Sequence, residues 1–146
     1  MNNLIIEFIN KQTCATICGI DEQNSPYCFS CFYAFGGNNG VLYFKSSAAT
    51  RHSDVLANNP LIAGTILPDK LNTLMVKGIQ FEGAVLHEAH PFAKAAAKVF
   101  YKKHTAAMAM PGELWALELQ HIKMTDSTLG FGKKINWNRS EEVVAL

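Results

Sequence analysis

The chain has 146 residues, of which 49% are hydrophobic and 17% are charged, and its formal net charge at pH 7 is +1. This length suits one domain, 1–146, with one core, and a charge so close to zero argues against a broad nucleic-acid- or membrane-binding surface. No stretch approaches the roughly 20 apolar residues of a membrane-spanning helix. The N-terminus carries Glu7 and lacks the basic segment of a signal peptide, so we expect a cytoplasmic protein.

The first sixty residues predict one helix, three strands and a second, shorter helix. Apolar residues at helical spacing indicate an amphipathic helix over residues 2–11. Runs rich in β-branched and aromatic residues then indicate strands over residues 13–20 and 27–35, and from residue 41 onward. The sequence Gly-Gly-Asn-Asn-Gly before the third strand is typical of a hairpin turn. A short helix is predicted over 50–59, with Thr50 or Ser53 as its N-cap.

The second half of the chain adds further strands around one longer helix. Strands are predicted over residues 61–67, 73–87, 114–123 and 129–137. Gly78 and Gly83, within the longest of these strands, indicate bulges or bends. The remaining segments are predicted as a helix over 91–103, a Met-rich loop over 105–112 and a C-terminal tail over 138–146.

Six or seven strands at close spacing, mostly joined by short turns, favour a mainly β protein. The expected architecture is an antiparallel barrel with two or three helices outside it. The sequence has neither the regular alternation of strands and helices nor the Gly-x-Gly-x-x-Gly motif of a dinucleotide-binding fold.

The four cysteines and five histidines do not predict a metal site. Cys28 and Cys31 have the Cys-x-x-Cys spacing, but residues three apart on a strand point to opposite faces and chelate poorly. No pair of histidines has clear metal-ligand spacing with a carboxylate. We expect the cysteines to be buried thiols that act as small hydrophobic groups, with a redox role for Cys28 and Cys31 as the alternative.

The junction between the third strand and the second helix is the strongest candidate for a binding site. Ser46 and Ser47 end the strand, and Thr50, Arg51 and His52 begin the helix. A helix N-terminus offers free backbone N–H groups and the positive end of the helix dipole, so this combination suits a phosphate. The alternative is a solvated corner at which the arginine pairs with a surface acid.

Aromatic residues are frequent on the strands beside this junction. They belong to the core or line a pocket for a flat ring: Phe29, Phe32, Tyr33, Phe35, Tyr43, Phe44, Trp115 and Trp137. An anion-binding corner next to aromatic strands suits a ligand with a phosphate and a planar ring.

Three segments carry a resemblance to a known family. The segment 43–60, with Thr50-Arg51-His52 and Asn58-Asn59-Pro60, resembles the flavin-binding motif of the pyridoxamine 5′-phosphate oxidase-like split-barrel proteins. The segments 76–83 and 128–134 are similar to a small bacterial subgroup of these proteins. The resemblance implies a six-stranded antiparallel split β-barrel of the FMN-binding type, a homodimer, and FMN in a cleft between the two subunits.

The resemblance also implies roles for individual residues. By position, Arg51 binds the FMN phosphate, and His52, which stands where the family often has lysine, donates to the same phosphate. Ser46 and Ser47 supply hydroxyl groups to the phosphate or the ribityl chain, with Lys45 beside them. Other residues are implied to flank or reach the flavin: Phe32, Tyr33, Lys77, Gln80 and, from the second subunit, Trp137.

The function that follows is an FMN-dependent oxidoreductase that acts on a small molecule, with FAD as another cofactor to consider. The C-terminal Trp…Arg signature of the true oxidases has no clear counterpart, so pyridoxamine phosphate oxidation itself is not expected. The alternative is a non-catalytic module that holds flavin or haem. A haem would require a histidine ligand, for which the candidates are His52, His87 and His121.

Overall fold

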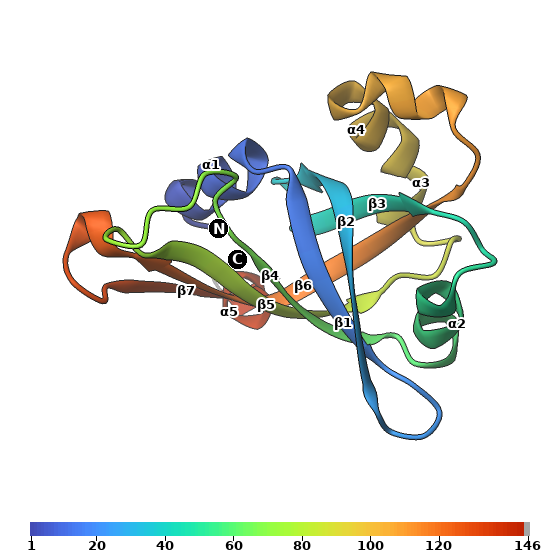
Figure 1. The fold of residues 1–146 in the computed structure, drawn as a ribbon, viewed down its shortest axis with the longest axis horizontal. Helices are drawn as coiled ribbons and strands as arrows, with labels where there is room; N and C mark the ends of the chain where they lie inside the picture. Colours follow the sequence, from blue (N-terminus) through green and yellow to red (C-terminus); the bar gives the residue numbers. More distant parts are fainter. Residues whose placement is uncertain (145–146) are drawn as a thin grey trace.

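The computed structural model describes residues 1–144, which form a strongly bent antiparallel sheet with helices at its ends (Figure 1). The strands in this part of the chain are β1 (Cys14–Ile20), β2 (Pro26–Gly36), β3 (Val41–Ser46), β4 (Leu61–Ile66), β5 (Lys77–Val85), β6 (Glu113–Asp126) and β7 (Lys134–Asn138). The α-helices are α1 (Asn3–Lys11), α2 (Arg51–Asn58), α3 (Pro91–Lys94), α4 (Ala96–Lys103) and α5 (Arg139–Val144). None of the helices described is long and apolar enough to cross a membrane.

Six of the strands close into a barrel, and the seventh lies beside it. The strand order is β3-β2-β1-β4-β5-β6-β7, and β3 also pairs with β6. The long strand β6 makes this closure, because one of its edges pairs with β5 while the other pairs first with β3 and then with β7. The register shifts between Glu82 and Gly83, which confirms one of the two predicted irregularities. The expected mainly β fold with a six-stranded antiparallel barrel is therefore confirmed.

The barrel is open along part of β2. This strand pairs with β1 from Pro26 to Phe32, but it pairs with β3 only from Tyr33 to Gly36. Helix α2 packs against β1 and β2 near the opening. At Gly19 a Cβ atom would lie 2.9 Å from Val55 Cγ1, so the glycine lets the helix approach the sheet closely. We call the opening between residues 26–32 of β2 and the end of β3 the split.

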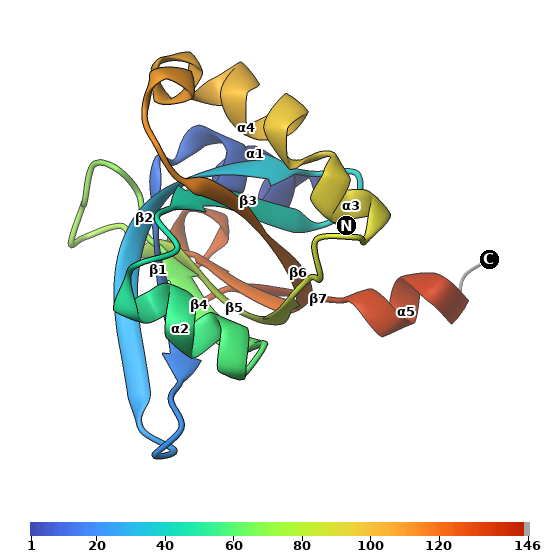
Figure 2. The same cartoon turned by 90° about the vertical axis from the view of Figure 1, so that its right-hand side faces the viewer.

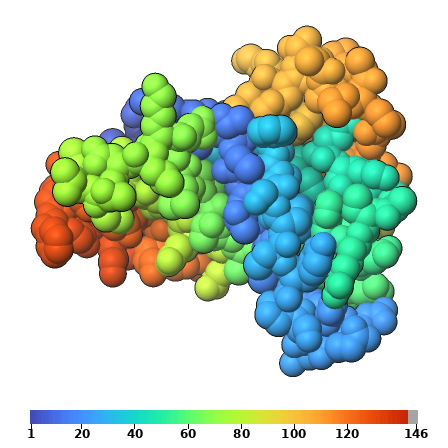
Figure 3. All heavy atoms as spheres, viewed as in Figure 1, coloured from blue at the N-terminus to red at the C-terminus, as the bar shows by residue number. Residues whose placement is uncertain are grey.

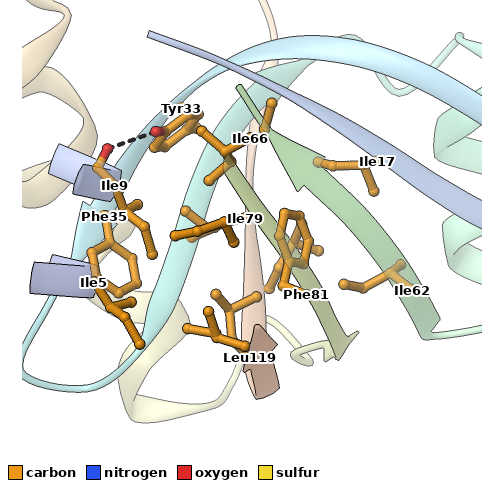
Figure 4. Close-up of a cluster of buried hydrophobic side chains, with 14 of the residues drawn as sticks. Ile5, Ile9, Ile17, Tyr33, Phe35, Ile62, Ile66, Ile79, Phe81 and Leu119 are labelled. Atoms are coloured by element: carbon orange, nitrogen blue, oxygen red, sulfur yellow. Dashed lines mark hydrogen bonds between the residues drawn. The ribbon is translucent and has the colours of Figure 1, made fainter. Parts of the chain in front are cut away.

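The main core fills the barrel interior beneath α1. Ile5 and Ile9 of α1 are fully buried against side chains from the strands (Figure 4). The Tyr33 hydroxyl donates a 2.6 Å hydrogen bond to the Ile9 carbonyl, which ties the helix to β2. Helix α1 thus closes one end of the barrel with apolar residues and one directed polar contact.

Several predicted boundaries were wrong for local reasons. The strand predicted over 73–87 begins only at Lys77, because the Asn72 side chain accepts the N–H of Leu74 and starts a turn. The strand predicted over 129–137 begins at Lys134, since Gly130 and Gly132 have φ values of +132° and +68°.

Two further segments differ from the sequence prediction. The helix over 91–103 is divided at Ala95, whose ψ of −7° departs from helical geometry, and the loop over 105–112 contains a 3-10 helix, Thr105–Ala109. The predicted tail, 138–146, begins inside β7 and continues as α5, while residues 145–146 lie outside the described part. This segment is anchored because the Arg139 side chain donates to the carbonyl oxygens of Leu119, Asn39 and Gly40.

Candidate functional site

The N-terminus of α2 is held at the end of β3 by hydroxyl groups. Thr50 is the N-cap, and its Oγ1 accepts the backbone N–H of Ser53 at 3.3 Å, which selects one of the two predicted caps. The Thr50 and Ser53 hydroxyls donate to the Ser47 carbonyl at 3.0 and 2.8 Å. The Ser47 hydroxyl accepts the N–H of Ala49 at 3.2 Å. These contacts give the helix a fixed start directly after the strand.

Ser46 and His52 meet at this corner. The Ser46 hydroxyl lies 2.5 Å from Nε2 of His52. The imidazole stacks on the ring of Phe29, with 4.1 Å between centroids and 12° between planes. Burial lowers the pKa of His52 below its ordinary value, so the imidazole is neutral at pH 7. The corner therefore presents a serine and an uncharged histidine, held flat against an aromatic ring.

A hollow of about 280 Å³ occupies the split beside this pair. Its walls are mostly aromatic or apolar: Phe29, Phe32, Phe44, Phe100, Ala107, Met110 and Pro111, with Ser30, Cys31, Lys45, Ser46 and His52. Helix α2 and the segment after α4 lie on opposite sides of β3 (Figure 2). The Lys45 ammonium donates to the carbonyl oxygens of Ala107 and Met110, at 2.8 and 2.5 Å. This lysine thus fixes the segment that forms one wall.

Arg51 does not line the hollow, unlike the adjacent His52. Its guanidinium lies 3.4 Å from the Asp21 carboxylate and 4.6 Å from the centre of the Tyr27 ring, and the side chain is 65% exposed. Both contacts belong to the β1–β2 hairpin, whose tip projects from the molecule in the space-filling view (Figure 3). This is the arrangement that the sequence offered as the alternative, an arginine paired with a surface acid.

The two aromatic residues predicted to flank a flavin lie on opposite faces of β2. Phe32 is 64% exposed and lines the hollow. Tyr33 is 1% exposed and points into the barrel, where it contacts Ile9. Of this pair, only Phe32 is brought to the hollow.

The remaining predicted residues lie elsewhere on the chain described. The Lys77 ammonium is 3.1 Å from the carboxylate of Asp126, which is buried. Gln80 lines a separate hollow on the outer face of the sheet. Trp137 is 7% exposed in the core, with the guanidinium of Arg139 5.4 Å from its ring. The resemblance implies that Trp137 reaches the flavin of a second subunit, and this role stays a prediction.

Two features of the site were missed by the sequence reasoning. Phe29 stacks on the imidazole although 23 residues separate Phe29 from His52 in the chain. The Met-rich segment lines the hollow through Met110 and Pro111. The second feature had a signal, because exposed methionines in a loop are typical of adaptable binding surfaces. The first depends on how α2 packs against β2.

The prediction that all four cysteines are buried was wrong. Cys14 and Cys28 are exposed, while Cys18 and Cys31 are half-buried, so the expectation of four buried thiols fails. Cys28 and Cys31 do lie on opposite faces of their strand, as predicted. Among the residues described, no group of three or more His, Cys, Asp or Glu side chains is placed to hold a metal ion.

Comparison with solved structures identifies the class of fold. The chain superposes on a heme binding protein from Mycobacterium smegmatis with a TM-score of 0.74 at 16% identity, over 90% of this chain and 55% of that longer protein. It also matches an FAD-binding protein from Mesorhizobium loti with a TM-score of 0.59 at 16% identity, over 84% of this chain and 92% of that protein. A third match is HutZ, the heme storage protein from Vibrio cholerae, with a TM-score of 0.60 at 13% identity, over 82% of this chain and 89% of that protein. The chain thus has the split β-barrel fold that is typical of pyridoxamine 5′-phosphate oxidase-like proteins.

Sequence comparison gives the family. No family model matches the chain. UPF0306 proteins of Yersinia pestis and Yersinia pseudotuberculosis are 35% identical to it over 146 residues, which covers 97% of this chain and 99% of each relative. The chain therefore belongs to the UPF0306 family.

Proposed function

We propose that the protein is a cofactor-binding module that holds a flavin, FMN in the first instance, in the split. The proposal depends on one observation, the 280 Å³ hollow in which aromatic walls meet the Ser46 hydroxyl at the end of β3 and the His52 imidazole at the start of α2. Planar aromatic ligands gain from offset or edge contacts with aromatic side chains. A phosphate gains from the free N–H groups and dipole of a helix N-terminus. FMN carries both features on one molecule.

Arg51 can join this site at low cost. The Arg51 side chain is 65% exposed and the Asp21 side chain is 12% exposed, and ion pairs near the surface contribute about 0–1 kcal/mol. The contact with the Tyr27 ring adds about 0.5–1 kcal/mol at an exposed position. A hydrogen bond between charged partners contributes about 1.5–3 kcal/mol, so a phosphate would replace the contact with Asp21 by one of the same kind. On this proposal the arginine moves when the ligand binds.

A second copy of the chain is the proposed cover for the open side of the hollow. Phe32, Met108 and Met110 are 64%, 63% and 64% exposed in a single chain, although all three are large apolar residues. Phe32 and Met110 both line the hollow, and exposed apolar residues gathered at one place are typical of an interface. A homodimer would therefore complete the site.

Flavin, when bound, supplies two-electron chemistry toward a small-molecule substrate. The protein's share is to position the ring and the phosphate. The Lys45 ammonium is held by two carbonyl oxygens, and the neutral His52 imidazole is the other basic side chain that lines the hollow. We place binding first and an oxidoreductase activity second.

Haem is the second candidate ligand. It is favoured by the neutral imidazole of His52, since a neutral ring nitrogen is the form that ligates iron. The other two histidine candidates do not line this hollow. The His87 imidazole accepts the N–H of Ala89, and His121 lines the outer-face hollow.

The first experiment is the visible spectrum of the purified protein before and after addition of FMN, FAD or haemin and removal of the unbound ligand. We expect stoichiometric flavin retention by the wild type, with the flavin reoxidisable after reduction. Arg51→Ala and His52→Ala should each weaken FMN binding by about 10- to 100-fold, the equivalent of one charge-assisted contact. Lys98→Ala, on the exposed side of α4, is the matched control and should bind as the wild type does.

Three outcomes would change the proposal. A Soret band that depends on His52, without flavin retention, would replace flavin by haem. Reduction of the bound flavin by NADH or NADPH would favour an oxidoreductase over a non-catalytic binding module. Failure to retain any of the three ligands would reject the site.

A further inference from the structure

Two cysteines face each other directly across β1 and β2. In the register of this antiparallel pair, Cys18 lies opposite Cys28. The N–H of Asp21 donates to the carbonyl of Ser25 at 2.9 Å, which marks that pair as a hydrogen-bonded one. Hydrogen-bonded and non-hydrogen-bonded pairs alternate along such a ladder, so the cysteines, three residues further on, form a non-hydrogen-bonded pair.

This kind of pair has the geometry that a disulfide needs. Opposed residues at non-hydrogen-bonded positions have Cα atoms about 4.5 Å apart and their side chains close together. Disulfides span Cα separations of about 4.4–6.8 Å. The neighbouring pair of the same kind, Thr16 and Ser30, already places its two hydroxyl oxygens 3.3 Å apart. A bond between Cys18 and Cys28 would thus require little movement of the backbone.

Both thiols are open to small molecules. Cys28 is exposed and Cys18 is half-buried, and the two line the same outer-face hollow of about 340 Å³. The hydrogen bond between the two thiols, and then burial, raises the pKa of Cys18 above its ordinary value. The more exposed Cys28 is therefore the thiol that an incoming disulfide meets first.

We propose that Cys18 and Cys28 form a reversible dithiol–disulfide site, with a small disulfide such as oxidised glutathione as its oxidant. The Cys28 thiolate attacks one sulfur of glutathione disulfide, and the glutathione S–S bond breaks to release one glutathione thiolate. The Cys18 thiolate then attacks Cys28 Sγ in the mixed disulfide and releases the second glutathione. Two protein thiols lose two electrons and two protons, and one glutathione disulfide gains them to become two glutathione thiols.

The other two cysteines lack this arrangement. Cys14 lies opposite Phe32, and it is four residues from Cys18 along the strand, a distance of about 13 Å. Cys31 lies opposite Ala15, which is buried, and packs against the main core. Cys14 and Cys31 are therefore the natural controls for the pair.

The bond would act on the hairpin that holds Arg51. Residues 19–27 lie between the two cysteines, and they include both Asp21 and Tyr27, which contact the guanidinium. Oxidation closes this loop covalently, so the hairpin keeps its pairing when other contacts loosen. The redox state of the pair would thus determine how firmly this platform is held.

The test uses the fully reduced full-length protein, equilibrated with mixtures of reduced and oxidised glutathione, quenched with acid and alkylated with N-ethylmaleimide. We expect mass spectrometry to show the loss of two of the four alkylated thiols, a cross-linked peptide pair containing Cys18 and Cys28, and full recovery after dithiothreitol. The double variant Cys14→Ser/Cys31→Ser should form the same bond. Cys18→Ser should stop at a Cys28–glutathione adduct.

The outcomes separate cleanly. An oxidised wild type that keeps four alkylated thiols, or that joins Cys28 to a different cysteine or to a second chain, would overturn the proposal. So would a Cys18→Ser variant that loses two thiols as the wild type does. Circular dichroism of each variant ensures that the comparison is made between folded proteins.

Discussion

The two halves of β2 differ sharply although their composition is similar. From Tyr33 to Gly36 the strand pairs with β3, and three of these four residues are buried. From Pro26 to Phe32 it pairs with β1 alone, and its side chains alternate between exposed and half-buried. Each half pairs with one strand, and both halves carry aromatic residues, so the elements packed on them, and not composition, make one half core and the other half the wall of a hollow. Tyr33 and Phe35, in the half paired with β3, lie in the main core with residues of α1, and Ala34 packs in a second cluster with Phe100 of α4.

Phe32 and Tyr33 show the difference at adjacent positions. The phenylalanine is 64% exposed at the split, whereas the tyrosine is 1% exposed and hydrogen-bonded inside the barrel. The alternation of a strand sends them to opposite faces, and closure by β3 begins at the second of them. Substitutions in the two halves test this contrast.

Phe35→Ala, in the paired half, should have the largest effect. Phe35 is 6% exposed within the main core, and replacing a buried phenylalanine by alanine costs about 3–5 kcal/mol through lost burial and the cavity left behind. Chemical denaturation should show this as a lower unfolding midpoint. Leu74→Ala, at a position that is 91% exposed, should change the free energy of unfolding by less than about 0.5 kcal/mol.

Tyr33→Phe should have the next largest effect. It removes the hydroxyl that donates to the Ile9 carbonyl, and a buried carbonyl left without its partner costs about 1–3 kcal/mol. Tyr27→Phe, in the half that pairs with β1, is the matched control and should be nearly neutral. Equal losses in the two variants would mean that the halves do not differ as described.

Much of the barrel could be predicted because its signals are local. Runs rich in β-branched and aromatic residues indicate the strands, and Thr50, one of the two predicted caps, starts α2 through the ordinary chemistry of an N-cap. The boundaries that failed involve the glycines at 130 and 132, whose positive φ values cannot be inferred from an apolar run. Local pattern gives the elements, while backbone conformation at a few residues determines where they end.

The candidate site was harder to predict because it depends on pairing. Ser46 and His52 are close in sequence and were placed together correctly as neighbours at one corner. The partner of Arg51 could not be inferred, because Asp21 is 30 residues away on a hairpin whose position follows from the register of β1 with β2. The same register brings Cys18 to Cys28, whereas the sequence drew attention to the Cys-x-x-Cys spacing.

The acid sensitivity of the split should depend on His52. Its pKa is lowered by burial, so the unfolded chain takes up this proton near pH 6.5 and the folded chain only at lower pH. Below about pH 6.5 the unfolded state binds more protons, and the free energy of unfolding falls as the pH falls. Above about pH 6.5 the free energy of unfolding is no longer reduced by protonation of this group.

Thermal unfolding at pH 7.5 and pH 5.5 measures this effect. The wild type should lose more of its Tm between the two pH values than His52→Gln, which keeps an amide beside Ser46 but does not titrate. Parallel losses in the two proteins would show that other groups carry the acid sensitivity.

Phe32→Ala should have the smallest effect on folding and a large one on binding. The side chain is 64% exposed, so its removal should change the free energy of unfolding by no more than about 0.5 kcal/mol. It also lines the hollow, and loss of an aromatic contact with a planar ligand corresponds to about 0.5–1.5 kcal/mol, or roughly 2- to 12-fold in the Kd for FMN. Titration with FMN, alongside denaturation, separates the two quantities.

Phe131→Ala is the control, because Phe131 is a fully exposed phenylalanine in the turn before β7, and it should leave both the free energy of unfolding and the Kd for FMN unchanged. If Phe32→Ala instead loses several kcal/mol of stability with unchanged binding, the half of β2 that pairs with β1 is core like the half that pairs with β3, and the split is not a ligand site.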